Sequence, residues 1–156
     1  MIQTTATGSG GIVSTGANAV YSGFSVGFSI GGVNNIIQVY SYSADYRPTT
    51  GKRINDGLWH TVLVTYDGTT LSIYVDGRLD NTATNWNSAS TSPIASQLNT
   101  VGNTENRLGQ LNSIDLCFWV GKLKNVQLYD YVIINSYALA YSYQLAGSSI
   151  YTSGIN

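Results

Sequence analysis

The stretch that decides the fold runs from Leu58 to Asp80 and reads LWHTVLVTYDGTTLSIYVDGRLD. Its residues alternate with a period of two, which indicates β-strands. Two sets each share one face: His60, Val62, Val64 and Tyr66 before the first Asp-Gly pair, and Leu71, Ile73 and Val75 after it. Asp-Gly between such runs predicts hairpin turns, because glycine accepts a positive φ without strain. We therefore predict an antiparallel meander of about three strands, with an apolar face that a second sheet must cover.

Short alternating or apolar runs recur along the rest of the chain, and clusters of Gly, Asn, Asp or Ser separate them. The strands expected outside the meander are Gly11–Thr15, Gly23–Ile30, Asn35–Tyr42, Ile114–Val120 and Lys122–Asp130. Strands this short, without intervening helices, are typical of a β-sandwich or barrel. Polar composition predicts loops at Asn85–Pro93 and Asn103–Asn112. One short helix is expected after Asn135, ending near Gly147.

Composition excludes several classes of protein. The 156 residues are enough for one domain with a substantial core, and only 10% of them are charged, against a usual value of about 25%. The net charge of −1 argues against nucleic acid and anionic membranes as partners. Since no apolar run approaches about 18 residues, we expect no membrane span, and the first residues do not form a signal peptide. Cys117 has no partner for a disulfide and is expected to be a buried, inert thiol.

Three segments carry a resemblance to a known family. INDGLWHTVLVTYDGTTLSIYVDGRL, from Ile54, resembles the D-G-x-W-H and Y-V-D-G motifs of laminin-G-like, concanavalin A-like domains. GGIVSTG from Gly10 and WVGKLKNVQLYD from Trp119 are similar to other strands of that family, although Asn125 stands where the family has Asp. The resemblance implies an all-β, antiparallel two-sheet jelly-roll sandwich with one short C-terminal helix, spanning residues 1–156. Because family members have further strands before the position of Met1, we expect the first strands of the fold to be lacking.

The resemblance identifies a fold and leaves the activity open, because this fold also occurs in glycoside hydrolases. Hydrolysis of a glycoside requires two carboxyl groups that flank the bond. The chain has one glutamate, Glu105, and lacks the Glu-x-Asp-x-x-Glu pattern of the glucanases. Its Asp-Gly aspartates are expected to serve turns, and His60 shares a face with Val62, which favours a structural histidine. We expect no catalytic residues and no enzyme activity, with a glycoside hydrolase as the least favoured alternative.

A binding module is the favoured function. If each strand crosses its sheet in turn, Ser43–Asn55, the Asp76-Gly77 turn and Asn103–Asn112 fall at one rim. The resemblance implies carbohydrate binding by rim loops, often with calcium, and oxygen-rich side chains suit that ion. The predicted calcium ligands are Asp45, Asn103 and Glu105, and the predicted ligand-binding residues are Tyr46, Asn106 and Arg107. The competing interpretation is that these are solvated loops.

A structural or adhesive module of a virion, phage or cell-surface protein is the alternative, and the charge-poor surface fits it equally well. The fold resemblance favours an extracellular or virion-associated location. Strands Gly11–Thr15 and Lys122–Asp130 are expected to flank a vacant strand position with exposed edges. We therefore predict a homo-oligomer that pairs these edges, or a monomer in which Ser148–Asn156 fills the gap. The partner is thus carbohydrate or another protein.

Overall fold

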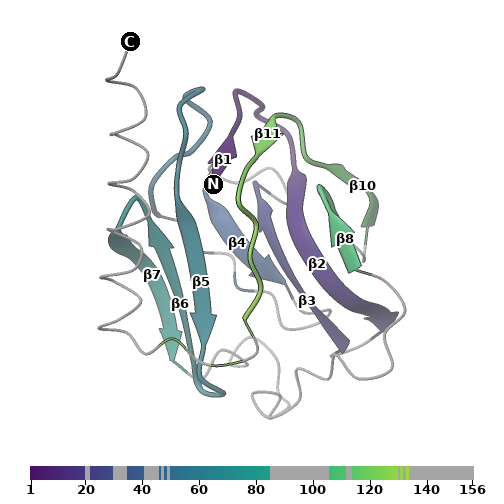
Figure 1. Cartoon of the computed structure of the whole chain (residues 1–156), viewed down its shortest axis with the longest axis vertical. Coiled ribbons are helices and arrows are strands. Elements are labelled where there is room, and N and C mark those ends of the chain that lie inside the picture. Colours follow the sequence, from purple (N-terminus) through teal and green to yellow (C-terminus); the bar gives the residue numbers. More distant parts are fainter. Residues whose placement is uncertain are drawn as a thin grey trace.

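In a computed structural model of the chain, the structure describes residues 1–19, 22–29, 35–40, 46, 48, 50–84, 106–111, 114–129, 131 and 133. The elements of this part are all strands (Figure 1). They are β1 (Ile2–Gln3), β2 (Gly10–Ala19), β3 (Ser22–Phe28), β4 (Ile37–Tyr40), β5 (Val62–Tyr66), β6 (Thr70–Val75), β7 (Arg78–Thr84), β8 (Asn106–Leu108), β9 (Gln110–Leu111), β10 (Ile114–Phe118) and β11 (Lys122–Leu123). None of the described residues belongs to a helix that could cross a bilayer. The helix predicted after Asn135 lies outside the described residues.

The two larger sheets form a sandwich, as predicted, and the pairs β1-β11 and β9-β10 form two further two-stranded sheets. One sheet has the order β4-β3-β2-β8 and the other the order β5-β6-β7, and neighbours within each are antiparallel. Both sheets contribute to a single apolar cluster, which also includes residues from the segments that join them. Its buried members are Ile2, Ile12, Val26, Phe28, Ile37, Val39, Ile54, Leu71, Ile73 and Val75. Burial of this cluster between the sheets is the main source of stability, since apolar area removed from water drives folding.

The predicted meander is confirmed in β5, β6 and β7. Val75 pairs with Arg78 across a two-residue turn in which Asp76 and Gly77 have φ of 51° and 77°. Positive φ at both central positions is the geometry that matches the twist of a hairpin. Every residue of β6 from Leu71 to Val75 is buried, so this central strand is covered on both faces rather than on one.

The chain begins in a strand that the sequence did not predict. Ile2 exchanges two backbone hydrogen bonds with His60, at 2.8 Å each, so β1 lies beside the residues that lead into β5. On its other side β1 pairs with β11, with Gln3 opposite Lys122. Gly121 makes this pairing possible: its φ is 145°, and a Cβ built on it would lie 2.1 Å from the carbonyl oxygen of Gln3. The glycine of the WVGKLKNV motif is therefore required by the close approach of two backbones.

Two expectations about strands are corrected. The polar segment Asn103–Asn112, predicted to be a loop, contains β8 and β9, because Leu108 pairs with Val13 of β2. The strand predicted at Lys122–Asp130 ends at Leu123. Asn125 has φ of 50°, which the extended backbone of a strand does not allow. As a result Val126 is 38% exposed.

The expected exposed edge at Gly11–Thr15 is also wrong. This segment is part of β2, which has β3 on one side and β8 on the other. The prediction failed because β8 was not foreseen, so β2 was expected to lack a neighbour. Ser148–Asn156, predicted to fill a gap, lies outside the described residues.

Candidate ligand-binding site

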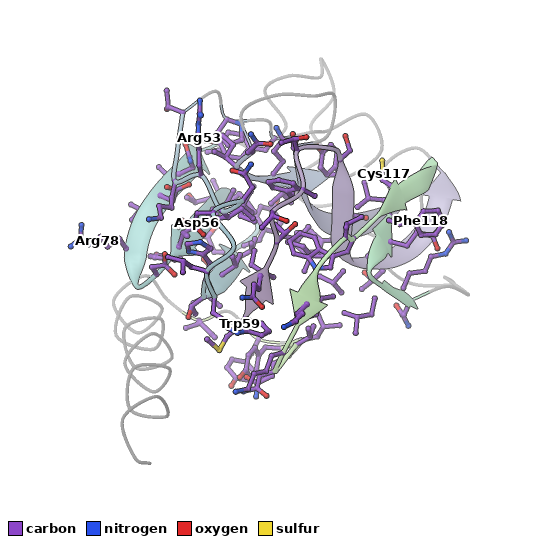
Figure 2. All side chains as sticks on the ribbon, turned by 90° about the horizontal axis from the view of Figure 1, so that it is seen from above. Arg53, Asp56, Trp59, Arg78, Cys117 and Phe118 are labelled. Atoms are coloured by element: carbon purple, nitrogen blue, oxygen red, sulfur yellow. The ribbon has the colours of Figure 1, made fainter. Side chains whose placement is uncertain are left out.

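A histidine held between two aspartates closes the end of the meander. His60 Nδ1 lies 2.8 Å from Asp76 Oδ2, and His60 Nε2 lies 2.8 Å from Asp56 Oδ1. The second oxygen of Asp76 accepts a hydrogen bond from the backbone N–H of Thr61 at 3.0 Å, and Asp56 accepts one from Leu58. Asp56 is labelled in Figure 2. These bonds tie the start of β5 to the β6–β7 turn.

The three groups adjust one another's pKa. The hydrogen bond to Asp76 raises the pKa of His60, and the bond to Asp56 adds to this, although burial opposes both. The backbone N–H of Leu58 lowers the pKa of Asp56, and His60 lowers it further. Burial alone would raise the pKa of Asp76, but hydrogen bonds from His60 and Thr61 outweigh it and leave that pKa lowered. Both carboxylates therefore favour the charged imidazolium, which can donate a hydrogen bond to each of them.

His60 is a structural residue, as the sequence predicted. It is 2% exposed, and both ring nitrogens already have a carboxylate partner. A general base needs a nitrogen that can reach a substrate proton, and this ring offers none in its present arrangement. The Asp-Gly aspartates that flank it serve the turn and the ring. The cluster therefore joins the start of β5 to the β6–β7 turn and stabilises the fold.

The sandwich contains a cavity of about 400 Å³ between β5, the first residues and the segment that follows β11. Its walls come from both sheets. They are formed by Met1, Ile2, Ile12, Val13, Thr15, Phe24, Val26, the five residues of β5, residues 125–129, Tyr131 and Ile133. None of these described residues has a charged side chain. Ligand sites are commonly concave and mostly apolar with a few polar groups, and this cavity has that character.

A pair of tyrosines lies at the cavity, on the segment after β11. The rings of Tyr129 and Tyr131 meet edge to face, with centroids 5.4 Å apart and an angle of 62°. They are 41% and 64% exposed, and the neighbouring Leu128 is 62% exposed. Gln127 accepts a hydrogen bond from the hydroxyl of Tyr129 at 2.7 Å. This exposed group of aromatic, aliphatic and amide side chains is a candidate contact surface for a ligand.

The structure separates the residues that parity placed at one rim. Tyr46 is hydrogen-bonded through its backbone to Val39 of β4, and its hydroxyl donates to the carbonyl of Thr82 in β7 at 3.0 Å. Asn106 and Arg107 lie in β8, at the opposite edge of the β4-β3-β2-β8 sheet. Three strand spacings separate those edges, a distance of about 14 Å. Tyr46 therefore lies beside one edge of this sheet, and Asn106 and Arg107 lie at the other.

The predicted calcium ligands, Asp45, Asn103 and Glu105, lie outside the described residues. Within the part of the chain that the structure describes, no group of three or more His, Cys, Asp or Glu side chains could hold a metal ion. The described residues therefore offer no test of calcium binding. Cys117 is buried as predicted, and its burial raises the pKa of the thiol. It lies far from Asp56 across the molecule (Figure 2).

Sequence reasoning missed the tyrosine pair. We expected Lys122–Asp130 to be one strand, and an ordinary strand would have turned its residues alternately toward the core and toward solvent. The signal that could have revealed it is Asn125, which occupies the family's Asp position and readily adopts a positive φ. Because the strand is interrupted at Asn125, the side chains that follow do not have to alternate between the core and the solvent.

The chain resembles proteins of known family and structure. A family model described as concanavalin A-like lectin/glucanases superfamily matches residues 2–135. No curated protein matches the chain. A 2.1 Å crystal structure of an S-layer domain-containing protein from Clostridium thermocellum is similar, with 15% sequence identity and a TM-score of 0.43. The match covers 94% of this chain and 66% of that one. Since the family model spans most of the sequence and the structure is an antiparallel two-sheet sandwich, the chain belongs to the concanavalin A-like lectin/glucanase superfamily.

Proposed function

We propose that this domain is a non-catalytic binding module and that it binds carbohydrate at the tyrosine pair. The observation that carries the proposal is the exposure of Tyr129 and Tyr131 beside Gln127, at the cavity between the sheets. Aromatic rings offer a large apolar face and a polar hydroxyl, which suits the apolar faces and hydroxyl groups of a sugar ring. Membership of a superfamily that includes lectins makes carbohydrate the first ligand class to test.

Binding without reaction is supported by the chemistry of the described residues. General acid–base catalysis needs a titratable group that a substrate can reach, and glycoside cleavage needs two such carboxyl groups. The described histidine and its two aspartates are committed to one another and to the backbone. The cavity lining offers hydroxyls and amides but no charged side chain among the described residues. Such a lining can hold a neutral ligand.

The experiment is a glycan array followed by titration calorimetry on any glycan that binds. We expect Tyr131→Ala to weaken binding at least tenfold, a loss of about 1.4 kcal/mol. Phe118→Ala is the matched control, because Phe118 is also aromatic and 54% exposed but lies on β10, outside the cavity lining. Equal losses in both variants would contradict the proposed position of the site. A blank array for the wild-type protein would contradict carbohydrate binding itself.

A structural or adhesive module is a second candidate function. It is favoured by the outer edge of β5, where backbone groups of Val62 and Val64 have no partner among the described residues. An edge of this kind can pair with another chain. Calcium binding is proposed only at Asp45, Asn103 and Glu105. A comparison of melting temperatures with and without calcium tests it.

A further inference from the structure

The two carboxylates that hold His60 are bonded to the backbone in different ways. Asp76 uses a separate oxygen for each contact: Oδ2 lies 2.8 Å from His60 Nδ1, and Oδ1 accepts the N–H of Thr61 at 3.0 Å. Asp56 uses one oxygen for both contacts, because its Oδ1 lies 2.8 Å from His60 Nε2 and also accepts the N–H of Leu58 at 2.9 Å. A movement of the Asp56 oxygen away from the ring therefore also weakens its bond to the backbone.

The protonation state of the ring decides how many of these contacts can be hydrogen bonds. An imidazolium has an N–H on each nitrogen and can donate to both carboxylates, whereas a neutral imidazole has one N–H and one lone pair. In the neutral ring, one carboxylate oxygen must therefore face a lone pair at hydrogen-bond distance, where two acceptors repel each other. Loss of a proton from His60 thus turns one of its two contacts from attractive to repulsive.

Asp56 is the carboxylate that can move away from the ring. It is exposed, so water can hydrate its oxygens once the contact is lost, whereas Asp76 is half-buried. A half-buried carboxylate that loses a donor costs more free energy than an exposed one. Asp76 is also fixed in a turn, where its own φ is 51°. The neutral form of His60 should therefore keep its proton on Nδ1, toward Asp76.

The charged groups around the ring are few. Among the residues that the structure describes, Asp76 and Asp56 act on His60, and their hydrogen bonds raise its pKa above the ordinary 6.5 although burial opposes this. Lys52 lowers the pKa of both carboxylates, so they stay ionised as the ring titrates. β1 carries no titratable side chain, and Arg78 lies at the outer margin of the molecule, away from Asp56 (Figure 2). The ring is therefore charged below its raised pKa and neutral above it.

We propose that Asp56 and His60 form a pH-sensitive latch on the segment between Gly57 and His60. When the ring loses its Nε2 proton to the solvent, the Asp56 carboxylate moves away and releases the N–H of Leu58, while the bond to Asp76 persists. The latch is closed in the acidic form of the ring and open in the basic form. It does not involve the tyrosine pair, so it is independent of the carbohydrate proposal.

The latch acts on a short segment that is fixed at both ends. At one end, Gly57 donates to the carbonyl of Thr4 at 3.0 Å, and its own carbonyl accepts from the side chain of Gln3 at 2.7 Å. At the other end, His60 is bonded to β1 through its backbone. Neither set of bonds depends on the protonation of the ring. Opening the latch therefore frees the two residues between these ends and leaves the strands in place.

These two residues are Leu58 and Trp59, whose side chains are 64% and 39% exposed. With the latch closed, the bond from the Leu58 N–H to Asp56 holds their backbone in one arrangement. With the latch open, only the flanking residues hold it. The state of the latch therefore decides how firmly this exposed apolar pair is ordered.

The test is a pH titration of the whole protein by NMR, from about pH 5 to about pH 10. The Nε2 signal of His60 should move to that of an unprotonated nitrogen, while Nδ1 keeps its proton. The protection factor of the Leu58 amide, which is its exchange rate relative to an unfolded peptide at the same pH, should fall about tenfold, the scale of one hydrogen bond to a charged group. The amide of Thr61, which is bonded to Asp76, should keep its protection.

The turn at Asp67 provides an internal reference. Its Oδ1 accepts the N–H of Thr69 at 2.8 Å, which is the same bond across two residues that Asp56 makes to Leu58. Because His60 is the single histidine of the chain, this turn has no ring to titrate beside it. The protection of Thr69 should therefore stay constant while His60 titrates.

Two matched variants extend the test. Asp56→Asn keeps an acceptor for the Leu58 N–H, and its amide can donate to the lone pair of the neutral ring. The pH dependence at Leu58 should therefore disappear, and the titration midpoint of His60 should fall because one anion is lost. Asp67→Asn makes the same change in the reference turn and should leave both properties as they are in the wild type.

Three results would overturn the proposal. One is loss of the proton from Nδ1 instead of Nε2, together with reduced protection at Thr61. Another is constant protection at Leu58 while His60 titrates. The third is a ring that stays charged until Leu58, Thr61 and Thr69 lose protection together, because the latch would then have no open state in the folded protein.

Discussion

His60 Nδ1 and Asp76 Oδ2 lie 2.8 Å apart, and this contact joins the two ends of the β5–β6 hairpin. Asp76 adopts a positive φ in the turn that follows β6, which places its carboxylate beside both the imidazole and the N–H of Thr61. His60 in turn bonds to Ile2 through its backbone, so the same residue also fixes β1. The two motifs most typical of the family, W-H and V-D-G, thus meet in one structural cluster.

The cluster makes stability depend on pH. The pKa of His60 is raised above its ordinary 6.5, so its contribution is complete below about pH 6.5 and is lost as pH rises through the folded-state value. The pKa values of Asp56 and Asp76 are lowered from 3.8, so their contribution is complete above that value and is lost as pH falls. We expect the urea midpoint to be highest between about pH 4 and pH 6.5. Subtracting the pH profile of His60→Ala from that of the wild type removes the contributions of other titrating groups, such as the amine of Met1. A difference profile that is flat from pH 5 to pH 9 would argue against a charged His60.

Substitutions of Asp76 separate charge from turn geometry. Asp76→Ala removes the acceptors for His60 and Thr61 and should lower the free energy of unfolding by about 2–3 kcal/mol. Asp76→Asn keeps one acceptor and tolerates the positive φ, so it should cost clearly less and flatten the alkaline part of the pH profile. Chemical denaturation gives both values. Equal losses in the two variants would mean that the charge is unimportant.

Gly121→Ala tests the pairing of β1 with β11. The new Cβ would overlap the carbonyl of Gln3, and an alanine would also be strained at a φ of 145°, so we expect a loss of about 2–3 kcal/mol. Gly8→Ala is the control, since a Cβ added there would have no atom within 4 Å and the φ of Gly8 is not in the positive range. That change should remain within about 0.5 kcal/mol. A similar melting temperature for both variants would show that β1 contributes little.

Calcium binding through Asp45, Asn103 and Glu105 remains a prediction. An ion that binds only the folded state adds to the free energy of unfolding by mass action, by about 2.7 kcal/mol at a concentration 100 times Kd. The melting temperature rises as a consequence. We therefore expect the melting temperature in millimolar calcium to exceed that in chelator. Asp45→Asn combined with Glu105→Gln should abolish the difference. Identical melting curves for the wild type in the two buffers would exclude a calcium site.

Sequence alone predicted the meander and the sandwich, because period-two alternation and Asp-Gly turns depend on local rules. Leu71, Ile73 and Val75 are buried as their shared face required. The sequence did not predict that Ser72 and Tyr74, on the other face, are also buried. Their burial depends on residues outside the strand, which the alternation of the strand does not reveal. β8 and β9 were missed because their polar, three- and two-residue strands gain stability from pairing with their neighbours rather than from composition.

The candidate site was less predictable than the fold. The position of each loop was predicted by counting the strands that precede it, which works only if every strand is counted. Because β1, β8 and β9 were omitted, Tyr46 was predicted to lie at the same rim as Asn106 and Arg107. The structural role of His60 was predicted because it shares a strand face with apolar residues. Its contact with Asp56 could not be predicted, because it depends on the three-dimensional path of the turn between the two residues. The tyrosine pair follows Asn125, whose positive φ is a backbone property that composition does not reveal.

The most direct test of the central claim is to incubate the protein with the strongest glycan from the array and measure binding and glycan integrity in the same sample. Calorimetry gives the affinity, and mass spectrometry of the recovered glycan detects cleavage. We predict saturable binding that Tyr131→Ala weakens at least tenfold, with the glycan recovered intact after prolonged incubation. Release of shorter sugars by the wild type would contradict a non-catalytic module. Binding unaffected by Tyr131→Ala would contradict the assignment of the site.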